Sequence, residues 1–257
     1  MAATVEGWRW DGELKRDVYL ASSSDVGKKL SLDPSSPNSV GRWLSSEDNK
    51  VRIQQHLTRY FTADYSGRHF EWFCSQSPSS QFGPWDVLAI EALSVGLPPQ
   101  TVRWLLEPDL KRDTLLDRAH QLVAEGKTLW ECDITLLRRG GALSDLYDLL
   151  RDEKGLGYVT TSKLMAAKFP RLVPIRDSRV EVLLNMKGQK EWWEPIRFLF
   201  ADNNGSLAIY LNEEFDMPPE IGEVTTLRRL DVILWMESRA RDQLPREALT
   251  AETQRES

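Results

Sequence analysis

Residues 152–180 read DEKGLGYVTTSKLMAAKFPRLVPIRDSRV, and this stretch decides the fold class that we expect. Gly155 and Gly157 separate two segments in which apolar residues recur at helical spacing. Glycine tolerates backbone conformations that other residues avoid, so the pair predicts a tight turn between two helices. We expect the second helix to begin near Tyr158 and to end near Lys168. The whole helix-turn-helix unit, with its flanks, is predicted over residues 143–186.

The helical pattern extends over most of the chain. Apolar residues recur at helical spacing in segments of roughly 8–18 residues joined by short loops, and alternation of period two is not sustained. The expected helices are about 47–61, 84–96, 99–107, 110–124, 129–137, 143–152, 158–168, 178–186, 191–200, 207–215 and 224–241. A short strand at 171–175 is the one departure that the sequence allows. The sequence therefore predicts an all-α fold, a helical bundle around the turn.

Composition divides the chain into three parts. Residues 1–47 contain few apolar residues and a run rich in Ser, Asp, Pro and Gly, which predicts a loop-rich N-terminal arm. Trp8 and Trp10 either fix this arm to the body or belong to a partly ordered tail. Residues 48–241 form the expected helical domain or domains. Residues 242–257 are polar and are predicted to be a flexible tail.

Overall composition indicates a globular, cytoplasmic protein. The 257 residues are 41% hydrophobic and 28% charged. Cys74 and Cys132 are too few for a disulfide framework or a four-thiolate site, and His56, His69 and His120 lack metal-ligand spacing. No segment reads as a secretory signal or a membrane span. We expect neither a metal nor another cofactor, and the sequence does not indicate an oligomeric state.

Charge is distributed unevenly along the chain. The net charge of −6 argues against a protein that coats nucleic acid by bulk charge. Residues 154–179 nevertheless carry six basic residues and one acidic residue, a local charge of +5. Such a patch is typical of a localised contact with duplex DNA, although a solvated helix face gives the same pattern.

The turn and the helix after it supply candidate groups for binding DNA phosphates. Free N–H groups at a helix N-terminus, beside glycine amides, can hold a phosphate oxygen. Threonine hydroxyls and basic side chains would add to that contact. The candidate phosphate-binding residues are Gly155, Gly157, Thr160, Thr161, Lys163, Lys168, Arg176 and Arg179.

Asp177 is the candidate catalytic residue. It stands in the segment PIRDSRV, 20 residues after Gly157, directly before the apolar-periodic segment that begins at Ser178. That position is ideal for a helix N-cap, whose oxygen accepts from first-turn amides. A cap alone and a cap that is also catalytic both fit the sequence.

The glycine turn and the spaced aspartate together resemble the helix-hairpin-helix DNA glycosylase superfamily. In that superfamily an L-x-G-h-G hairpin, where h is hydrophobic, precedes a helix, and a P-x-x-D-[ST]-x-V segment with a catalytic aspartate follows. Gly155, Leu156 and Gly157 match the hairpin and Asp177 matches the aspartate, so the resemblance covers about residues 153–183. It implies a DNA-glycosylase-like fold and a base flipped out of duplex DNA. Over about residues 48–240 the chain is also similar to an actinobacterial protein family without an assigned function.

Departures from the superfamily pattern narrow the expected activity. Members that also cleave the strand place a lysine where this chain has Val159, so lyase chemistry is not expected. The four-cysteine cluster of some members is absent, and Arg179 stands where the pattern often has histidine. The resemblance thus implies a monofunctional DNA N-glycosylase acting on a damaged or modified base. The alternatives are a non-catalytic DNA-binding module and a structural hairpin in a protein that binds proteins or small molecules.

Other side chains are weaker candidates for a site. His69 lies beside Arg68 and Glu71, and Glu71 could act as a second carboxylate in a pocket. Several aromatic residues could stack on a flipped base, although core packing is the more economical interpretation for most of them. These aromatic residues are Trp72, Phe73, Trp85, Trp104, Trp192 and Trp193.

Overall fold

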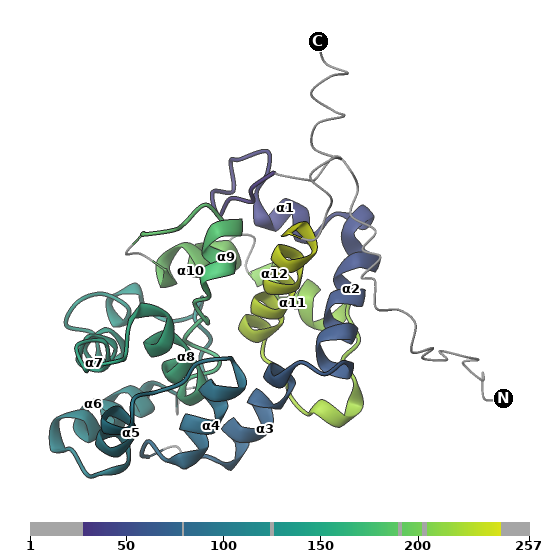
Figure 1. The fold of residues 1–257 in the computed structure, drawn as a ribbon. Coiled ribbons are helices and arrows are strands. Elements are labelled where there is room, and N and C mark those ends of the chain that lie inside the picture. Colours follow the sequence, from purple (N-terminus) through teal and green to yellow (C-terminus); the bar gives the residue numbers. More distant parts are fainter. Residues whose placement is uncertain (1–27, 79, 124–125, 190–191, 202–204, 243–257) are drawn as a thin grey trace.

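A computed structural model describes residues 28–78, 80–123, 126–189, 192–201 and 205–242 (Figure 1). Within these ranges the protein is all-helical, as the sequence predicts, and the one β-type pairing is an isolated bridge between Ser31 and Ser39. The α-helices are α1 (Val40–Leu44), α2 (Glu47–Thr62), α3 (Phe70–Gln76), α4 (Pro84–Ala92), α5 (Pro99–Leu106), α6 (Leu110–Val123), α7 (Ala142–Arg151), α8 (Tyr158–Lys168), α9 (Ser178–Leu183), α10 (Trp193–Ala201), α11 (Ser206–Glu213) and α12 (Thr226–Asp242). Short 3-10 helices are η2 (Ser66–His69), η3 (Ile134–Leu136) and η5 (Pro219–Ile221).

The segment 129–137 differs from the predicted helix. Only η3 forms there, because the Glu131 carboxylate accepts from the amide and the hydroxyl of Thr128 and holds the chain in a turn. The amide of Leu129 donates to the carbonyl of Arg171 at 2.9 Å. That contact links two loops, and the segment 171–175 forms no strand.

Apolar side chains gather in two clusters. One cluster lies among α1, α2 and α9 to α12, and the other lies among α3 to α8. Leu137 and Trp193 are partly buried against both clusters. The helices α2 and α12 lie side by side at one side of the molecule and α5 to α7 lie at the other, with α8 between (Figure 1).

The described part of the expected N-terminal arm is built into the first cluster. Leu30, Val40, Trp43 and Leu44 are buried there, and the Leu30 amide donates to the Leu183 carbonyl at 3.0 Å. The expectations for Trp8 and Trp10, and for residues 243–257 of the tail, lie outside the described residues.

The helices α7 and α8 contact each other and are joined by the turn 152–157. Gly155 has a φ of +87°, and a Cβ atom there would lie 2.6 Å from the ring of Pro98, so the turn requires glycine on two grounds. Leu156 is buried beneath the turn. The bounds of α8 are those expected from the sequence, but the helix is covered on all sides from Thr161 onward. That burial governs the roles of its lysines.

Candidate functional site

A cleft of about 510 Å³ opens between the first turns of α8, the start of α9 and the face of α12. We call it the Asp177 cleft. Asp177 and Lys163 line it from one side, and residues of α12 and η2 line it from the other. It is within the size range that holds a small molecule or a nucleoside.

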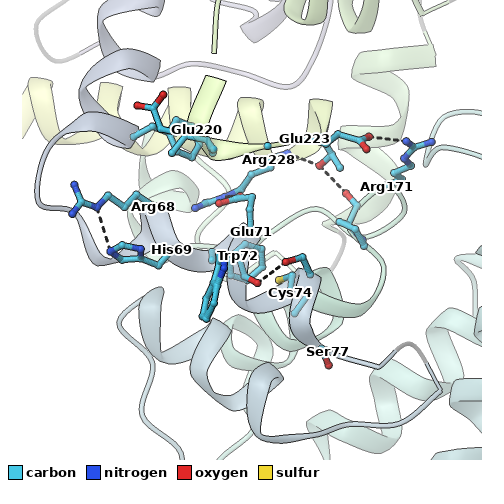
Figure 2. A pocket seen from close by; sticks show the side chains of 18 of the residues that line it. Arg68, His69, Glu71, Trp72, Cys74, Ser77, Arg171, Glu220, Glu223 and Arg228 are labelled. Atoms are coloured by element: carbon cyan, nitrogen blue, oxygen red, sulfur yellow. Dashed lines mark hydrogen bonds and ion pairs between the residues drawn. The ribbon is translucent and has the colours of Figure 1, made fainter. Parts of the chain in front are cut away.

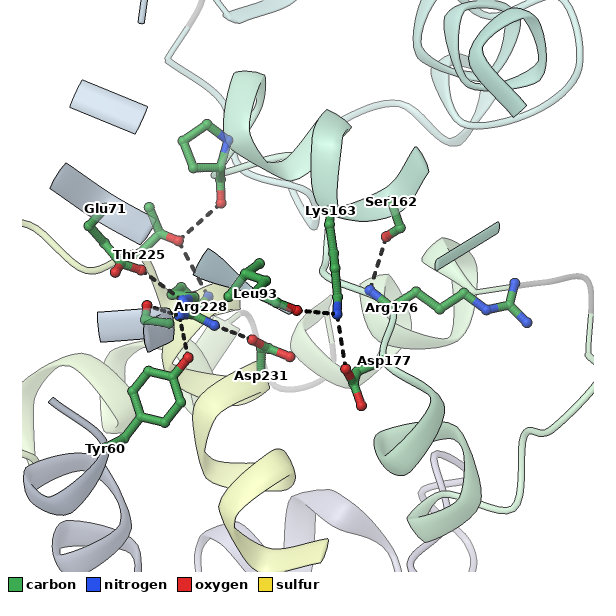
Figure 3. Close-up of polar contacts among 12 residues, drawn as sticks. Tyr60, Glu71, Leu93, Ser162, Lys163, Arg176, Asp177, Thr225, Arg228 and Asp231 are labelled. Carbon is green, nitrogen blue, oxygen red and sulfur yellow. Dashed lines mark hydrogen bonds and ion pairs between the residues drawn. The ribbon is translucent and has the colours of Figure 1, made fainter. Parts of the chain in front are cut away.

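Asp177 has two roles in this cleft. Its Oδ1 atom accepts from the amide of Arg179 at 2.9 Å and caps α9, which confirms the predicted N-cap. Its Oδ2 atom lies 3.1 Å from Nζ of Lys163, and Nζ also donates to the carbonyl of Leu93 at 3.0 Å. The carboxylate keeps 15% of its side-chain surface exposed, toward the cleft. Figure 3 shows Lys163 reaching from α8 to Asp177.

A serine of α8 fixes the segment that carries Asp177. The Ser162 hydroxyl donates to the carbonyl of Pro174 at 2.8 Å and accepts from the amide of Arg176 at 3.0 Å. Ser162 is fully buried, so these bonds are shielded from water. They hold residues 174–176 against α8 and leave Asp177 opposite Lys163.

Arg228 organises the opposite wall. Its guanidinium donates to Glu71 at 2.7 Å, to the Tyr60 hydroxyl at 2.8 Å and to the Gly67 carbonyl at 2.9 Å. It also forms an ion pair with Asp231, one helical turn further along α12 (Figure 3). A buried guanidinium with this many partners is fixed in position.

Burial changes the acidity of two groups in this wall. Burial raises the pKa of Asp231 from 3.8 to about 6, although the adjacent Arg228 acts in the opposite direction. The negative charge of Asp177 adds to that increase. Burial also raises the pKa of Tyr60 to about 12, so its hydroxyl stays protonated at neutral pH.

Aromatic rings form the rim beside Asp231. Tyr60 and Tyr65 stack with centroids 5.6 Å apart, and Trp235 meets Tyr65 edge-on at 5.7 Å. The guanidinium of Arg239 lies 5.2 Å from the Tyr65 ring and 5.0 Å from the Trp235 ring. The cleft therefore combines planar surfaces, carboxylates and cations.

Three of the candidate phosphate ligands form ion pairs inside the protein. Lys163 pairs with Asp177, Lys168 pairs with Asp86 at 2.8 Å, and Arg176 pairs with Glu181. All three are buried, so their charges are used inside the protein. Lys168 also donates to Ser77 Oγ and to the carbonyls of Pro78 and Gln81, which makes it a clamp on that loop.

The other candidates lie nearer the surface, apart from Thr161. Thr161 is fully buried, and its hydroxyl donates to the carbonyl of Leu156 at 3.4 Å. Gly155 and Gly157 are exposed in the turn and Thr160 is half-buried. Arg179 is exposed and pairs with Asp242 at 2.6 Å. Three of the six basic residues of this stretch, Lys168, Arg171 and Arg179, pair with acids from distant segments, whereas Lys163 and Arg176 pair with Asp177 and Glu181 nearby.

Sequence reasoning missed Asp231, Arg228 and Tyr65. The segment Thr226–Arg241 reads as a core helix with a charged outer face, and a buried Arg-Asp pair cannot be told from an exposed one by spacing alone. The only signal in the sequence for a buried pair is weak: Arg228 and Asp231 stand among apolar residues.

A second cleft, of about 960 Å³, contains other candidates from the sequence. Arg68 and His69 lie at one end of it, where Nε of Arg68 donates to Nε2 of His69 at 3.2 Å. The ion pair of Arg171 with Glu223 lies at the other end (Figure 2). Glu71 and Trp72 lie between these ends. Arg228 lines both clefts. The Asp177 cleft is the better candidate although it is smaller, because its carboxylates and Lys163 are buried in fixed geometry.

Fold and site define an all-helical protein with a polar cleft built by α8, α9 and α12. The chain belongs to DUF6308, a family of unknown function whose model matches residues 53–238. That span contains every residue that lines the Asp177 cleft except Arg239. No curated protein and no solved structure matches the chain.

Two further properties concern partners. No helix in the described ranges combines the length and apolar character needed to cross a lipid bilayer. In the same ranges, no group of three or more histidine, cysteine, aspartate or glutamate side chains is arranged to hold a metal ion.

Proposed function

We propose that the protein binds duplex DNA and hydrolyses the N-glycosidic bond of a damaged or modified base, with Asp177 as the catalytic carboxylate. The observation that carries this proposal is that Asp177 caps α9 and also lines an open cleft. A carboxylate that served only as a cap would need no cleft beside it. The cleft volume of about 510 Å³ accommodates a flipped nucleoside.

The geometry of Asp177 suits the chemistry of glycosidic bond cleavage. Departure of the base leaves positive charge on the sugar, which a fixed carboxylate stabilises, and the same carboxylate can activate the attacking water. Lys163 and the Arg179 amide fix the two carboxylate oxygens, so little reorganisation accompanies the reaction.

Contact with the DNA backbone is proposed at the turn between α7 and α8. Lys154, Gly155 and Gly157 are exposed there, and Tyr158 keeps 43% of its surface open. Backbone amides at the start of α8 can hold a phosphate oxygen. This contact uses exposed groups, whereas Lys163, Lys168 and Arg176 act inside the fold.

A non-catalytic DNA-binding module is the second candidate. The observation in its favour is that both oxygens of Asp177 already have partners within the protein. In that case the cleft would hold a nucleotide without cleaving it, and DNA binding would be salt-sensitive and independent of sequence.

The test is incubation of the protein with duplexes that carry single modified bases, followed by alkali to break abasic sites. Asp177→Asn removes the charge and keeps an oxygen for the cap. Asp133→Asn is the matched control, because Asp133 caps η3 through the Thr135 amide outside the cleft. Strand breaks with wild type and Asp133→Asn, but not with folded Asp177→Asn, would support the glycosylase.

Other outcomes separate the alternatives. Salt-sensitive retention of the duplexes without strand breaks would favour the non-catalytic module. The absence of both breaks and retention would contradict DNA as the partner and direct attention to protein or small-molecule ligands.

A further inference from the structure

A buried cluster with an excess of acid lies between the two clefts, since Asp177 and Asp231 line the Asp177 cleft and Glu71 lines the second one. Three carboxylates, on Asp177, Asp231 and Glu71, are joined to two cations, on Lys163 and Arg228. None of the five side chains is more than 15% exposed. With all groups ionised the cluster would hold one uncompensated negative charge, which a poorly solvated site does not support.

The charged groups nearest the cluster have other partners or lie at the rim of the cleft. Arg179 pairs with Asp242, and Arg239 lies over aromatic rings at the rim. Asp64 is an exposed acid that pairs with Arg68. Tyr60 faces Arg228 as a neutral hydroxyl. Retention of one proton by the cluster is therefore the simplest way to balance its charge.

Asp231 is the carboxylate in the best position to hold that proton. Asp177 accepts from a backbone amide and from Lys163, whereas Glu71 and Asp231 share the guanidinium of Arg228. Glu71 lines the second cleft, and Asp231 is only 8% exposed. Burial raises the pKa of Asp231 to about 6, so this carboxyl holds a proton below about pH 6. It also lines the cleft that Asp177 lines.

We propose that Asp231 is a catalytic proton donor of the Asp177 cleft, and that the substrates are nucleotides whose neutral base must gain a proton as it leaves. The role rests on the proposed glycosylase function. The bond between C1′ and the base nitrogen breaks, its electron pair moves to the base, and the Asp231 proton moves to the base. A water oxygen bonds to C1′ and gives its proton to Asp177, so the products are a free base and an abasic sugar. The Asp177 proton then returns to Asp231 directly or through solvent.

Asp177 and Asp231 have different proposed roles because their surroundings differ. One carboxyl in the cleft is ion-paired with a lysine and the other is buried with a shared arginine, and pairs of this kind assign the base and the acid in an active site. A base that is already cationic in the nucleotide, such as 7-methylguanine, leaves as a neutral molecule without a donated proton, whereas hypoxanthine, which is neutral in the nucleotide, needs one. The difference in release rate between the two kinds of base therefore measures what Asp231 contributes as a proton donor.

The experiment compares wild type and Asp231→Asn on two duplexes, one with 7-methylguanine and one with hypoxanthine. Asparagine keeps the shape and an oxygen for Arg228, and circular dichroism checks the fold. We expect release of hypoxanthine to fall roughly 100-fold or more and release of 7-methylguanine to fall less than about 10-fold. Asp64→Asn, which removes an exposed charge from the same rim, is the control and is expected to keep the wild-type ratio.

A second measurement does not depend on activity. Protein labelled with ¹³C at the aspartate carboxyl is titrated by NMR, and we expect one signal with a midpoint near pH 6 that is absent from Asp231→Asn. If that signal is missing, or if the release of both bases slows by the same factor, Asp231 is not the donor. If wild type releases no base from any duplex, the proposed function and this role fall together, even when the titration shows that Asp231 holds a proton.

Discussion

Nζ of Lys163 lies 3.1 Å from Oδ2 of Asp177, and this ion pair joins the interior of α8 to the first turn of α9. The lysine that the sequence offers to DNA is therefore a partner of the candidate catalytic residue. Lys163 side-chain exposure is 7%, so the pair is shielded from salt.

Substitutions of Asp177 separate its structural and catalytic roles. Asp177→Ala removes the cap and leaves a buried cation without its partner, so we expect a loss of about 3–5 kcal/mol of unfolding free energy. Asp177→Asn keeps a capping oxygen but also removes the charge opposite Lys163, so we expect a smaller loss, of about 2–4 kcal/mol. Urea unfolding measures both, and equal losses would show that the cap contributes nothing to stability.

Lys168 is expected to govern stability. Lys168→Met leaves buried Asp86 without its cation, and the free energy of unfolding should fall by about 3–5 kcal/mol. The double variant Lys168→Met/Asp86→Asn should recover part of that loss. A Lys168→Met protein with unchanged urea stability would show that the ion pair is not formed.

The glycine turn can be tested with a matched pair. Gly155 and Gly188 both have positive φ angles, of +87° and +80°, but only Gly155 faces a neighbour, the ring of Pro98. Gly188→Ala should lower the free energy of unfolding by about 1 kcal/mol through backbone strain alone. Gly155→Ala should lower it by about 1–3 kcal/mol more, because the new Cβ atom conflicts with the ring of Pro98. Thermal unfolding of the two variants checks the difference, and equal costs would exclude tight packing at the turn.

Stability should depend on pH through Asp231. Its pKa rises from 3.8 to about 6 on folding, so the folded chain binds this proton more tightly than the unfolded chain. The resulting stabilisation is fully present below about pH 4 and is lost as pH rises through about 6. Relative to Asp231→Asn, the free energy of unfolding of the wild type should fall by up to about 3 kcal/mol between pH 4 and pH 7. Parallel stability curves of the two proteins would contradict this.

DNA binding should depend on exposed rather than buried lysines. Lys154→Gln, at the turn, should reduce the slope of log affinity against log salt by about 1. Lys50→Gln is the control, because Lys50 lies on α2, at the other side of the molecule from α7 (Figure 1). Fluorescence anisotropy with a labelled duplex measures the slopes, and equal slopes would remove the turn from the interface.

Local rules determined much of this protein. The sequence alone predicts the all-α class, the bounds of α8 and the cap at Asp177, because helical periodicity, glycine and capping act over a few residues. Trp192 is buried and Trp72 is exposed, and nothing in their immediate sequence distinguishes the two.

Tertiary structure decided what the charged residues do. Lys163 and Lys168 belong to one basic stretch of the sequence, but Asp177 and Asp86 neutralise them inside the fold. Asp231 lies 54 positions after Asp177 in the sequence, yet the packing of α9 against α12 brings it to the same cleft. The physical reason is that charge interactions depend on distance and burial in three dimensions, and neither quantity is set by neighbouring residues in the chain.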